Sequence, residues 1–341
     1  MTTSRSTSKR GAHRRRLLGA LGAAFIALVS SGISTASSTK PPAVRAWEIR
    51  YTAHNGVERQ AVVLLPAWYG QQNNPALPLV ISPHGRNGTG RGNAKYWGRL
   101  PATGRFAVIN PDGMGRRLPL KSYAYRGQID DLARMPELAR AALPWLRIDT
   151  ERIYALGSSM GGHETLMLVA RHPELLAGAV AMDSVTNLSR RYHQLPDVPC
   201  DRACLKRWGQ PYGLVLQAAM RKEVGGTPED ATQAYARRSP LENAYRIAFS
   251  GVQLQIWWSH ADRIVTDQKR QSRAFFRELK RLNPCAPVSA YAGGWEHSKE
   301  MKADALLPIA LADLGILRKG VERLPQSVHH QAAPRGCEGS P

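Results

Sequence analysis

The feature that most constrains the fold of this chain is residues 153–162, where an apolar run leads directly into the pentapeptide Gly-Ser-Ser-Met-Gly. Gly157 and Gly161 permit a tight turn, and the good helix formers in residues 163–170 predict a helix immediately after it. A strand, a sharp turn and a helix in this order expose a serine oxygen to a histidine and to backbone N–H donors. Ser159 is therefore the candidate nucleophile, at the positive end of that helix.

The rest of the chain alternates short apolar runs with stretches of helical spacing, which is typical of a mainly parallel sheet with helices on both faces. Asn55 and Gly56 predict a turn that joins two antiparallel strands at the start. The sequence therefore predicts an α/β fold. The expected strands are residues 47–52, 60–64, 79–82, 106–109, 153–156, 178–182, 254–258 and 288–292, and the later expected helices are residues 268–282 and 301–314.

The first 36 residues have the organisation of a secretory signal peptide. Residues 1–16 carry six Lys or Arg and no acidic residue, and residues 17–29 are an apolar run. That run is too short to span a bilayer, and small residues fit cleavage after Ala36. The three arginines at 14–16 resemble a twin-arginine signal. We expect a secreted protein with no stable membrane insertion after cleavage; the alternative is a retained membrane anchor.

The chain is strongly basic, with 47 Lys and Arg against 26 Asp and Glu and a formal net charge of +21. Six of the basic residues fall in the predicted signal peptide, so the mature chain would carry +15. Such a field can attract anionic polymers or membrane surfaces. The basic residues are mostly scattered singly, however, and no zinc finger, RNA-binding or helix-turn-helix signature is present. We therefore expect no nucleic-acid partner.

The four cysteines, Cys200, Cys204, Cys285 and Cys337, all lie in the C-terminal half of the chain. An even count in an exported protein favours two disulfides. Three connectivities are possible. We favour Cys200 with Cys204, because they share one short loop, and Cys285 with Cys337, because that bond would hold the tail. No histidine lies near these cysteines at the spacing of metal ligands, so we expect neither a metal nor a cofactor.

The expected signal peptide at residues 1–36 leaves a length that fits one large α/β domain, which we place at residues 37–317. The alternation of strand and helix breaks at residues 183–248. We interpret this segment as an insertion that caps the carboxyl edge of the sheet. Residues 318–341 predict an irregular C-terminal tail, and no internal repeat is present.

Four motifs and their order along the chain resemble those of the α/β hydrolase superfamily, and the likeness covers residues 58–315. The motifs are Ser159 in its turn, His84 and Gly85 after an earlier strand, Ser239-Pro240-Leu241 before the penultimate strand, and Asp262-Arg263-Ile264-Val265 after it. The chain is similar to single-domain hydrolases related to prolyl oligopeptidases, and to secreted feruloyl esterases and polyhydroxybutyrate depolymerases. Because about ten residues separate Ala36 from the first strand, we expect no β-propeller of the kind that gates true prolyl oligopeptidases.

The resemblance implies a catalytic order of Ser, acid and His. Asp262 stands four residues beyond the apolar run that includes Trp258, at the end of its strand. There it would orient the base and stabilise its charged form. Asp183, just after the preceding strand, is the alternative acid, because some hydrolases place it there.

The base must follow the acid, which leaves three histidines. His297 lies just past a strand, where a loop could deliver its ring to Ser159. His329 and His330 lie in the polar tail, where solvation is expected. His297 is therefore the predicted base.

The oxyanion that forms during acyl transfer needs two backbone donors. Met160, directly after the nucleophile, supplies one. The resemblance implies Arg86 for the other and a packing role for His84 beneath that loop. Trp295, two residues before the base, is the predicted wall of the substrate site, whereas most other aromatic residues are expected in the core.

These residues predict an enzyme of the serine hydrolase class that cleaves carboxylic esters through an acyl-enzyme. A serine peptidase that uses the same residues is the alternative, and a non-catalytic binding module is the third hypothesis. The substrate would be an ester or a peptide, small or polymeric. No acidic pair marks a site for a substrate amine, so nothing in the sequence favours an aminopeptidase.

Overall fold

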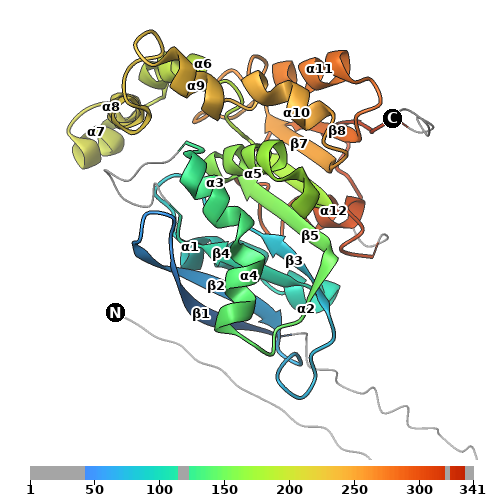
Figure 1. Ribbon diagram of the computed structural model, residues 1–341. Coiled ribbons are helices and arrows are strands. Elements are labelled where there is room, and N and C mark those ends of the chain that lie inside the picture. The colour runs from blue at the N-terminus through green and yellow to red at the C-terminus, as the bar shows by residue number, and fades with distance from the viewer. Residues whose placement is uncertain (1–42, 114–122, 319–322, 335–341) are drawn as a thin grey trace, which may run out of the picture. The chain divides into compact units, whose positions relative to one another are not determined.

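A computed structural model of the protein describes residues 43–113, 123–318 and 323–334, which contain a nine-stranded sheet (Figure 1). The strands are β1 (Val44–Thr52), β2 (Glu58–Pro66), β3 (Leu77–Ile81), β4 (Ala107–Pro111), β5 (Ile148–Ser158), β6 (Gly178–Met182), β7 (Gln253–Ser259), β8 (Val288–Gly293) and β9 (His329–Gln331). Their order in the sheet is β1-β2-β4-β3-β5-β6-β7-β8-β9. Strands β3 to β8 run parallel, whereas β2 is antiparallel to both neighbours and β9 is antiparallel to β8. The predicted α/β fold with a mainly parallel sheet is therefore confirmed.

Helices cover both faces of this sheet. The helices outside the segment between β6 and β7 are α1 (Gly90–Ala94), η1 (Lys95–Trp97), α2 (Leu100–Gly104), α3 (Arg126–Ala133), α4 (Met135–Ala142), α5 (Met160–Arg171), η2 (Pro173–Leu175), α11 (Ser272–Leu282) and α12 (Leu307–Asp313). One apolar cluster joins the sheet to α3, α4, α5 and α11, and a second joins its other face to η1, α2 and α12. Because both faces are covered, the central strands are apolar throughout, as in β3 and β6, where every residue is buried.

The segment between β6 and β7 is helical. It contains α6 (Leu188–Gln194), η3 (Leu195–Asp197), α7 (Arg202–Trp208), α8 (Tyr212–Val224), α9 (Thr232–Arg238), η4 (Leu241–Asn243) and α10 (Ala244–Ala248). Helices α6, α8 and α9 gather at the top of Figure 1 around an apolar cluster that also takes in Val265, which follows β7. Helix α10 instead packs in the main core against α5 and α11. The predicted insertion at 183–248 thus ends in a helix that packs with the helices covering one face of the sheet.

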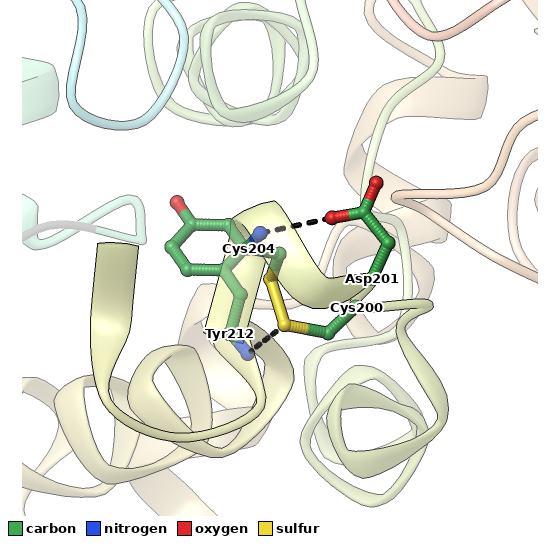
Figure 2. Close-up of a disulfide and its surroundings, with 4 residues drawn as sticks. All are labelled: Cys200, Asp201, Cys204 and Tyr212. Carbon is green, nitrogen blue, oxygen red and sulfur yellow. Dashed lines mark hydrogen bonds between the residues drawn. A yellow bond between two sulfur atoms is a disulfide. The ribbon is translucent and has the colours of Figure 1, made fainter. Parts of the chain in front are cut away.

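Cys200 and Cys204 form a disulfide at the start of α7, the pairing favoured from the sequence (Figure 2). Asp201 caps the same helix, because its side chain accepts a hydrogen bond of 2.9 Å from the backbone N–H of Cys204. Cys285 is also disulfide-bonded. Its predicted partner, Cys337, lies outside the described residues, as do the predicted signal peptide and its cleavage point.

The C-terminal tail is not irregular throughout, contrary to the sequence-based expectation. Residues 329–331 form β9, which pairs with the edge of β8, and the ring of His330 stacks on Tyr291 with centroids 4.4 Å apart. Val328, just before the strand, is buried in the core. An edge strand offers unpaired backbone groups, so a short segment with one apolar anchor is enough to pair with it.

Two helices begin later than expected. Helix α12 starts at Leu307 instead of 301, because Pro308 occupies its first turn, where proline is favoured. Helix α11 starts at Ser272 instead of 268, since Gln268 is turned toward Asp262. Within the described residues, no helix is both long and apolar enough to span a membrane.

Candidate active site

Ser159 lies on the turn between β5 and α5 in a strained backbone conformation. Its φ is +59° and its ψ is −122°, a region that non-glycine residues rarely adopt. The backbone N–H of Ser159 donates to the Met182 carbonyl over 2.9 Å, which ties the turn to the end of β6. A Cβ on Gly157 would collide with the Gly161 carbonyl, and one on Gly161 with the Pro83 carbonyl. The turn is therefore packed too closely for side chains on either side of the serine.

Asp262 and His297 are hydrogen-bonded to each other. The Nδ1 atom of His297 donates to Asp262 Oδ2 over 2.8 Å, and the Asp262 side chain is fully buried. Asp262 Oδ1 accepts from the backbone N–H groups of Ile264 and Val265 at 2.8 and 2.9 Å, and Oδ2 also accepts from Gln268 at 3.3 Å. The carboxylate is thus fixed from several directions. A proton held on Nδ1 leaves Nε2 of His297 as the basic nitrogen.

Ser159 and His297 line one cleft of about 410 Å³, together with the predicted oxyanion residues Met160 and Arg86. The loop that carries Arg86 lies against the nucleophile, because a Cβ on Gly85 would be 3.8 Å from the Ser159 Cβ. The structure therefore brings together at one cleft the candidate nucleophile, base and oxyanion donors.

His84 supports this loop from beneath. Its ring is buried, Nδ1 donates to the Gly85 carbonyl over 2.7 Å, and Nε2 accepts from the backbone N–H of Gly113 over 3.1 Å. Both ring nitrogens are therefore bonded to backbone groups, which fits the expected packing role.

Trp295 does not line the cleft, so its prediction as a substrate wall is wrong. Its indole Nε1 donates to Asp183 Oδ2 over 3.0 Å, and its ring packs near Trp257 with centroids 6.3 Å apart. A partly buried indole N–H needs an acceptor, and Asp183, directly after β6, supplies it. Tyr123, left among the expected core residues, is buried and does line the cleft.

Asp183, the alternative acid, holds the loop that carries His297. One oxygen accepts from the Ser259 backbone N–H at 2.9 Å, and the other from Trp295 and from the Ser298 backbone N–H at 3.3 Å. Burial and the nearby Asp262 charge raise the pKa of Asp183 to about 6.

Ligand atoms of Asp183, Asp262 and His297 lie within 4.8 Å of one another, a donor set that a small cation could use. In this structure those donors already have partners. The carboxylates accept from backbone, indole and amide N–H groups, and His297 Nδ1 donates to Asp262. The arrangement is therefore built for an acid and a base that share a proton.

A buried network links the nucleophile turn to the histidine loop. Ser158 Oγ donates to Glu300 Oε1 over 3.0 Å and lies 2.8 Å from Ser298 Oγ. Burial and the Asp183 charge raise the pKa of Glu300 well above its usual range. The neighbours of Ser159 and His297 are thus joined directly, and no sequence pattern signalled this.

Several cleft residues come from the insertion and were not predicted. Arg191 on α6, together with Tyr212 and Leu216 on α8, lines the cleft that contains Ser159. No motif marks these positions, because their approach to the serine depends on how the insertion folds back.

Comparison with known proteins finds a family match over part of the chain. Residues 127–291 match the profile of the prolyl oligopeptidase family, a stretch that includes Ser159 and Asp262 and ends before His297.

Solved structures with the same fold include both peptidases and an esterase-type hydrolase. Dipeptidyl peptidase 4 from Porphyromonas gingivalis is 18% identical with a TM-score of 0.58, over 81% of this chain and 35% of that protein. Acylaminoacyl peptidase from Pyrococcus horikoshii is 16% identical with a TM-score of 0.60, over 83% and 43%. S-formylglutathione hydrolase from Staphylococcus aureus is 16% identical with a TM-score of 0.55, over 75% and 92%.

The chain therefore spans less than half of either peptidase but most of the smaller hydrolase. At these identities the structures show a common fold, and the family match adds a similarity over residues 127–291. The described residues accordingly have the α/β hydrolase fold, and residues 127–291, just under half of the chain, match the prolyl oligopeptidase family.

Proposed function

We propose that the protein is a secreted carboxylic ester hydrolase in which Ser159 is the nucleophile, His297 the base and Asp262 the acid. The observation that carries the proposal is the hydrogen bond of 2.8 Å between His297 and the buried Asp262, with His297 and Ser159 at one cleft. A nucleophile, a base and a group that orients the base are the elements of acyl transfer by a serine.

In the proposed mechanism, His297 Nε2 accepts the hydroxyl proton as Ser159 Oγ attacks the acyl carbon. The backbone N–H groups of Met160 and Arg86 stabilise the oxyanion that forms, a contribution of about 3–4 kcal/mol for each donor in comparable enzymes. The alcohol then leaves with the proton from His297, and water repeats the sequence to release the acid. Asp262 stabilises the imidazolium at each stage.

The choice of an ester rests on the composition of the cleft. None of the described residues that line it is Asp or Glu, so the described cleft offers no carboxylate to bind a free substrate amine. Its lining carries apolar side chains and two arginines, Arg86 and Arg191, which suit an acyl group instead. The second candidate function is a serine peptidase, which the family match and the two peptidase structures favour.

The leaving group separates the two candidates. We expect kcat/KM for 4-nitrophenyl esters to exceed that for peptide 4-nitroanilides with matched acyl parts by at least about 10³-fold, a difference of about 4 kcal/mol in transition-state stabilisation. Because activated esters react readily with many serine hydrolases, the panel should also include methyl esters and matched amides. Faster cleavage of peptide anilides than of esters would establish the peptidase.

Secretion is proposed from the basic, apolar and small-residue regions of the first 36 residues. The disulfide between Cys200 and Cys204 supports an oxidising compartment. Sequencing the N-terminus of protein recovered from the culture medium should give a chain beginning at Ser37. Recovery only from the cytoplasm with an intact first residue would contradict secretion.

A further inference from the structure

Arg191 is a buried arginine whose guanidinium lacks a carboxylate. It lies on α6, is 3% exposed and lines the cleft beside Ser159. Its Nη1 atom is buried without a hydrogen-bond partner, and no ion pair among the described residues includes it. Burial lowers the pKa of Arg191, whereas Tyr123 and Asp262 raise it. A guanidinium stays protonated in proteins, so a positive charge is held here without a directly paired carboxylate among the described residues.

The other arginine of the cleft is different. Arg86 makes two hydrogen bonds to the carboxylate of Glu223, at 2.6 and 2.5 Å, and this carboxylate is itself buried. Among the described residues, therefore, Arg86 has a carboxylate partner and Arg191 has none. A buried charge without a partner destabilises the fold, so an unpaired guanidinium in a cleft indicates a binding site for an anion.

The helix that carries Arg191 is firmly anchored. Gln271 Oε1 accepts from the backbone N–H groups of Thr186 and Asn187 at 2.9 and 2.8 Å, just before α6 begins. The backbone N–H of Leu188 donates to Ser239 Oγ over 2.9 Å. The guanidinium is thus presented from a fixed element, as a preorganised binding group requires.

Apolar side chains share the cleft with Arg191. Val185, Leu216, Ile264 and Val265 line the same space and would contact the carbon chain of an acyl group attached to Ser159. Tyr212 adds a phenol, whose oxygen accepts a hydrogen bond of 3.0 Å from Asn87. The cleft therefore combines an apolar wall, the guanidinium of Arg191 and the phenol of Tyr212.

We propose that Arg191 binds a carboxylate on the acyl part of the substrate, so that the enzyme prefers half-esters of dicarboxylic acids. This inference rests on the proposed ester hydrolase function. One guanidinium matches the single charge of a carboxylate and its planar pair of oxygens. A doubly charged phosphate would instead leave an uncompensated negative charge in the same buried space.

The test compares, for each of three chain lengths, two esters that differ in one charge. The probes are the 4-nitrophenyl half-esters of glutaric, adipic and suberic acid and the same compounds with the free carboxylate methylated. We expect kcat/KM of the wild-type protein to be at least about tenfold higher for the anionic member at one chain length or more. In Arg191→Met this preference should vanish, measured as the ratio of kcat/KM between the anionic and the methylated member on the same variant.

Arg221→Met is the matched control, because Arg221 is an exposed arginine on α8 of the same insertion. It removes the same charge from the cap and should keep the preference. Arg191→Lys should keep part of it, since lysine supplies the charge without the bidentate fork. Equal loss in Arg191→Met and Arg221→Met would overturn the inference, because the preference would then reflect net charge.

A second measurement needs no variant. At the chain length with the largest preference, the monomethyl ester of the dicarboxylic acid should compete with the methylated nitrophenyl ester on the wild-type protein, and the dimethyl ester of the same acid should compete at least about tenfold less well. Equal competition by both, or a wild-type preference for the methylated esters at all three lengths, would overturn the inference alone. Failure to hydrolyse any ester, with no labelling of Ser159 by a fluorophosphonate, would instead overturn the proposed function and the inference with it.

Discussion

Two carboxylates lie close to the candidate base, and their hydrogen bonds give them different roles. Asp262 accepts directly from the Nδ1 atom of His297, whereas Asp183 accepts from backbone and indole N–H groups of the loop around it. The first contact sets the tautomer of the ring and the second sets where the loop lies. The side chains alone would not distinguish them, because ligand atoms of all three residues are within 4.8 Å.

We predict that Asp262→Asn lowers kcat/KM by about 10³–10⁴-fold, since an amide cannot stabilise the imidazolium and favours the wrong tautomer. Asp183→Asn should lower it by about tenfold or less, because an amide oxygen still accepts from the loop. Both variants nearly preserve volume, so steady-state kinetics with a nitrophenyl ester compare the loss of the charge and of one accepting oxygen at the two positions. A larger loss in Asp183→Asn would transfer the role of the acid to Asp183.

At this scale the sequence predicted the residues that motifs and chain order constrain. Ser159, Asp262 and His297 follow from a turn pattern and from the order of strands. Trp295 was misplaced because sequence position says where a residue leaves a strand and not which way its ring turns. Arg191 was missed because its approach to the cleft depends on contacts far apart in the chain.

The turn between β5 and α5 shows how closely packed backbone positions the nucleophile. Gly161 lies in the first turn of α5. A Cβ on it would collide with the carbonyl of Pro83, just after β3. A side chain there would push the helix away from the loop that carries Arg86. The strained φ of +59° at Ser159 persists because these neighbours hold it.

We therefore predict that Gly161→Ala lowers the free energy of unfolding by about 2–3 kcal/mol, the range for overpacking in a tightly packed site. Its labelling rate with a fluorophosphonate should also fall at least about tenfold, because the oxyanion donors separate. Gly70→Ala is the control, since a Cβ there meets nothing within 4 Å. Similar stability and labelling in both variants would show that the turn tolerates a side chain.

Elements were predicted well where burial on both faces makes a strand continuously apolar, as in β6, whose bounds agree with the expected 178–182. The start of α12 and the existence of β9 were not predicted from the sequence. A proline in the first turn delayed α12, and β9 forms because β8 offers an edge. Pairing of that kind depends on a partner strand about forty residues away, which local patterns do not contain.

The whole molecule carries an ionisable group in its core. Glu164 lies on α5, is 1% exposed, and has one carboxyl oxygen buried without a hydrogen-bond partner. Burial raises the pKa of Glu164 from 4.5 to about 8, with Gln128 and Arg59 opposing the shift. The folded protein therefore holds this proton more tightly than the unfolded chain does.

A raised pKa of this kind stabilises the fold fully below about pH 4.5, and the contribution is lost as the pH rises to about 8. Glu164→Gln cannot ionise. The difference in free energy of unfolding, variant minus wild type, should therefore increase by at least about 1.4 kcal/mol from pH 5.5 to pH 8.5, the equivalent of one pKa unit. Urea unfolding at both values measures this difference.

Glu242→Gln provides the control for that measurement, because Glu242 is exposed on η4. It should follow the wild-type pH dependence. Parallel curves for all three proteins would mean that Glu164 ionises in the folded state at an ordinary pH.

The central claim is that the whole fold serves to present Ser159 as a nucleophile, and covalent labelling tests it most directly. The wild-type protein is treated with a fluorophosphonate and digested, and the modified peptide is sequenced by mass spectrometry, with Ser159→Ala as the comparison. We predict one adduct on Ser159, and neither adduct nor ester hydrolysis in Ser159→Ala. Labelling at another serine, or hydrolysis that survives in Ser159→Ala, would contradict the account.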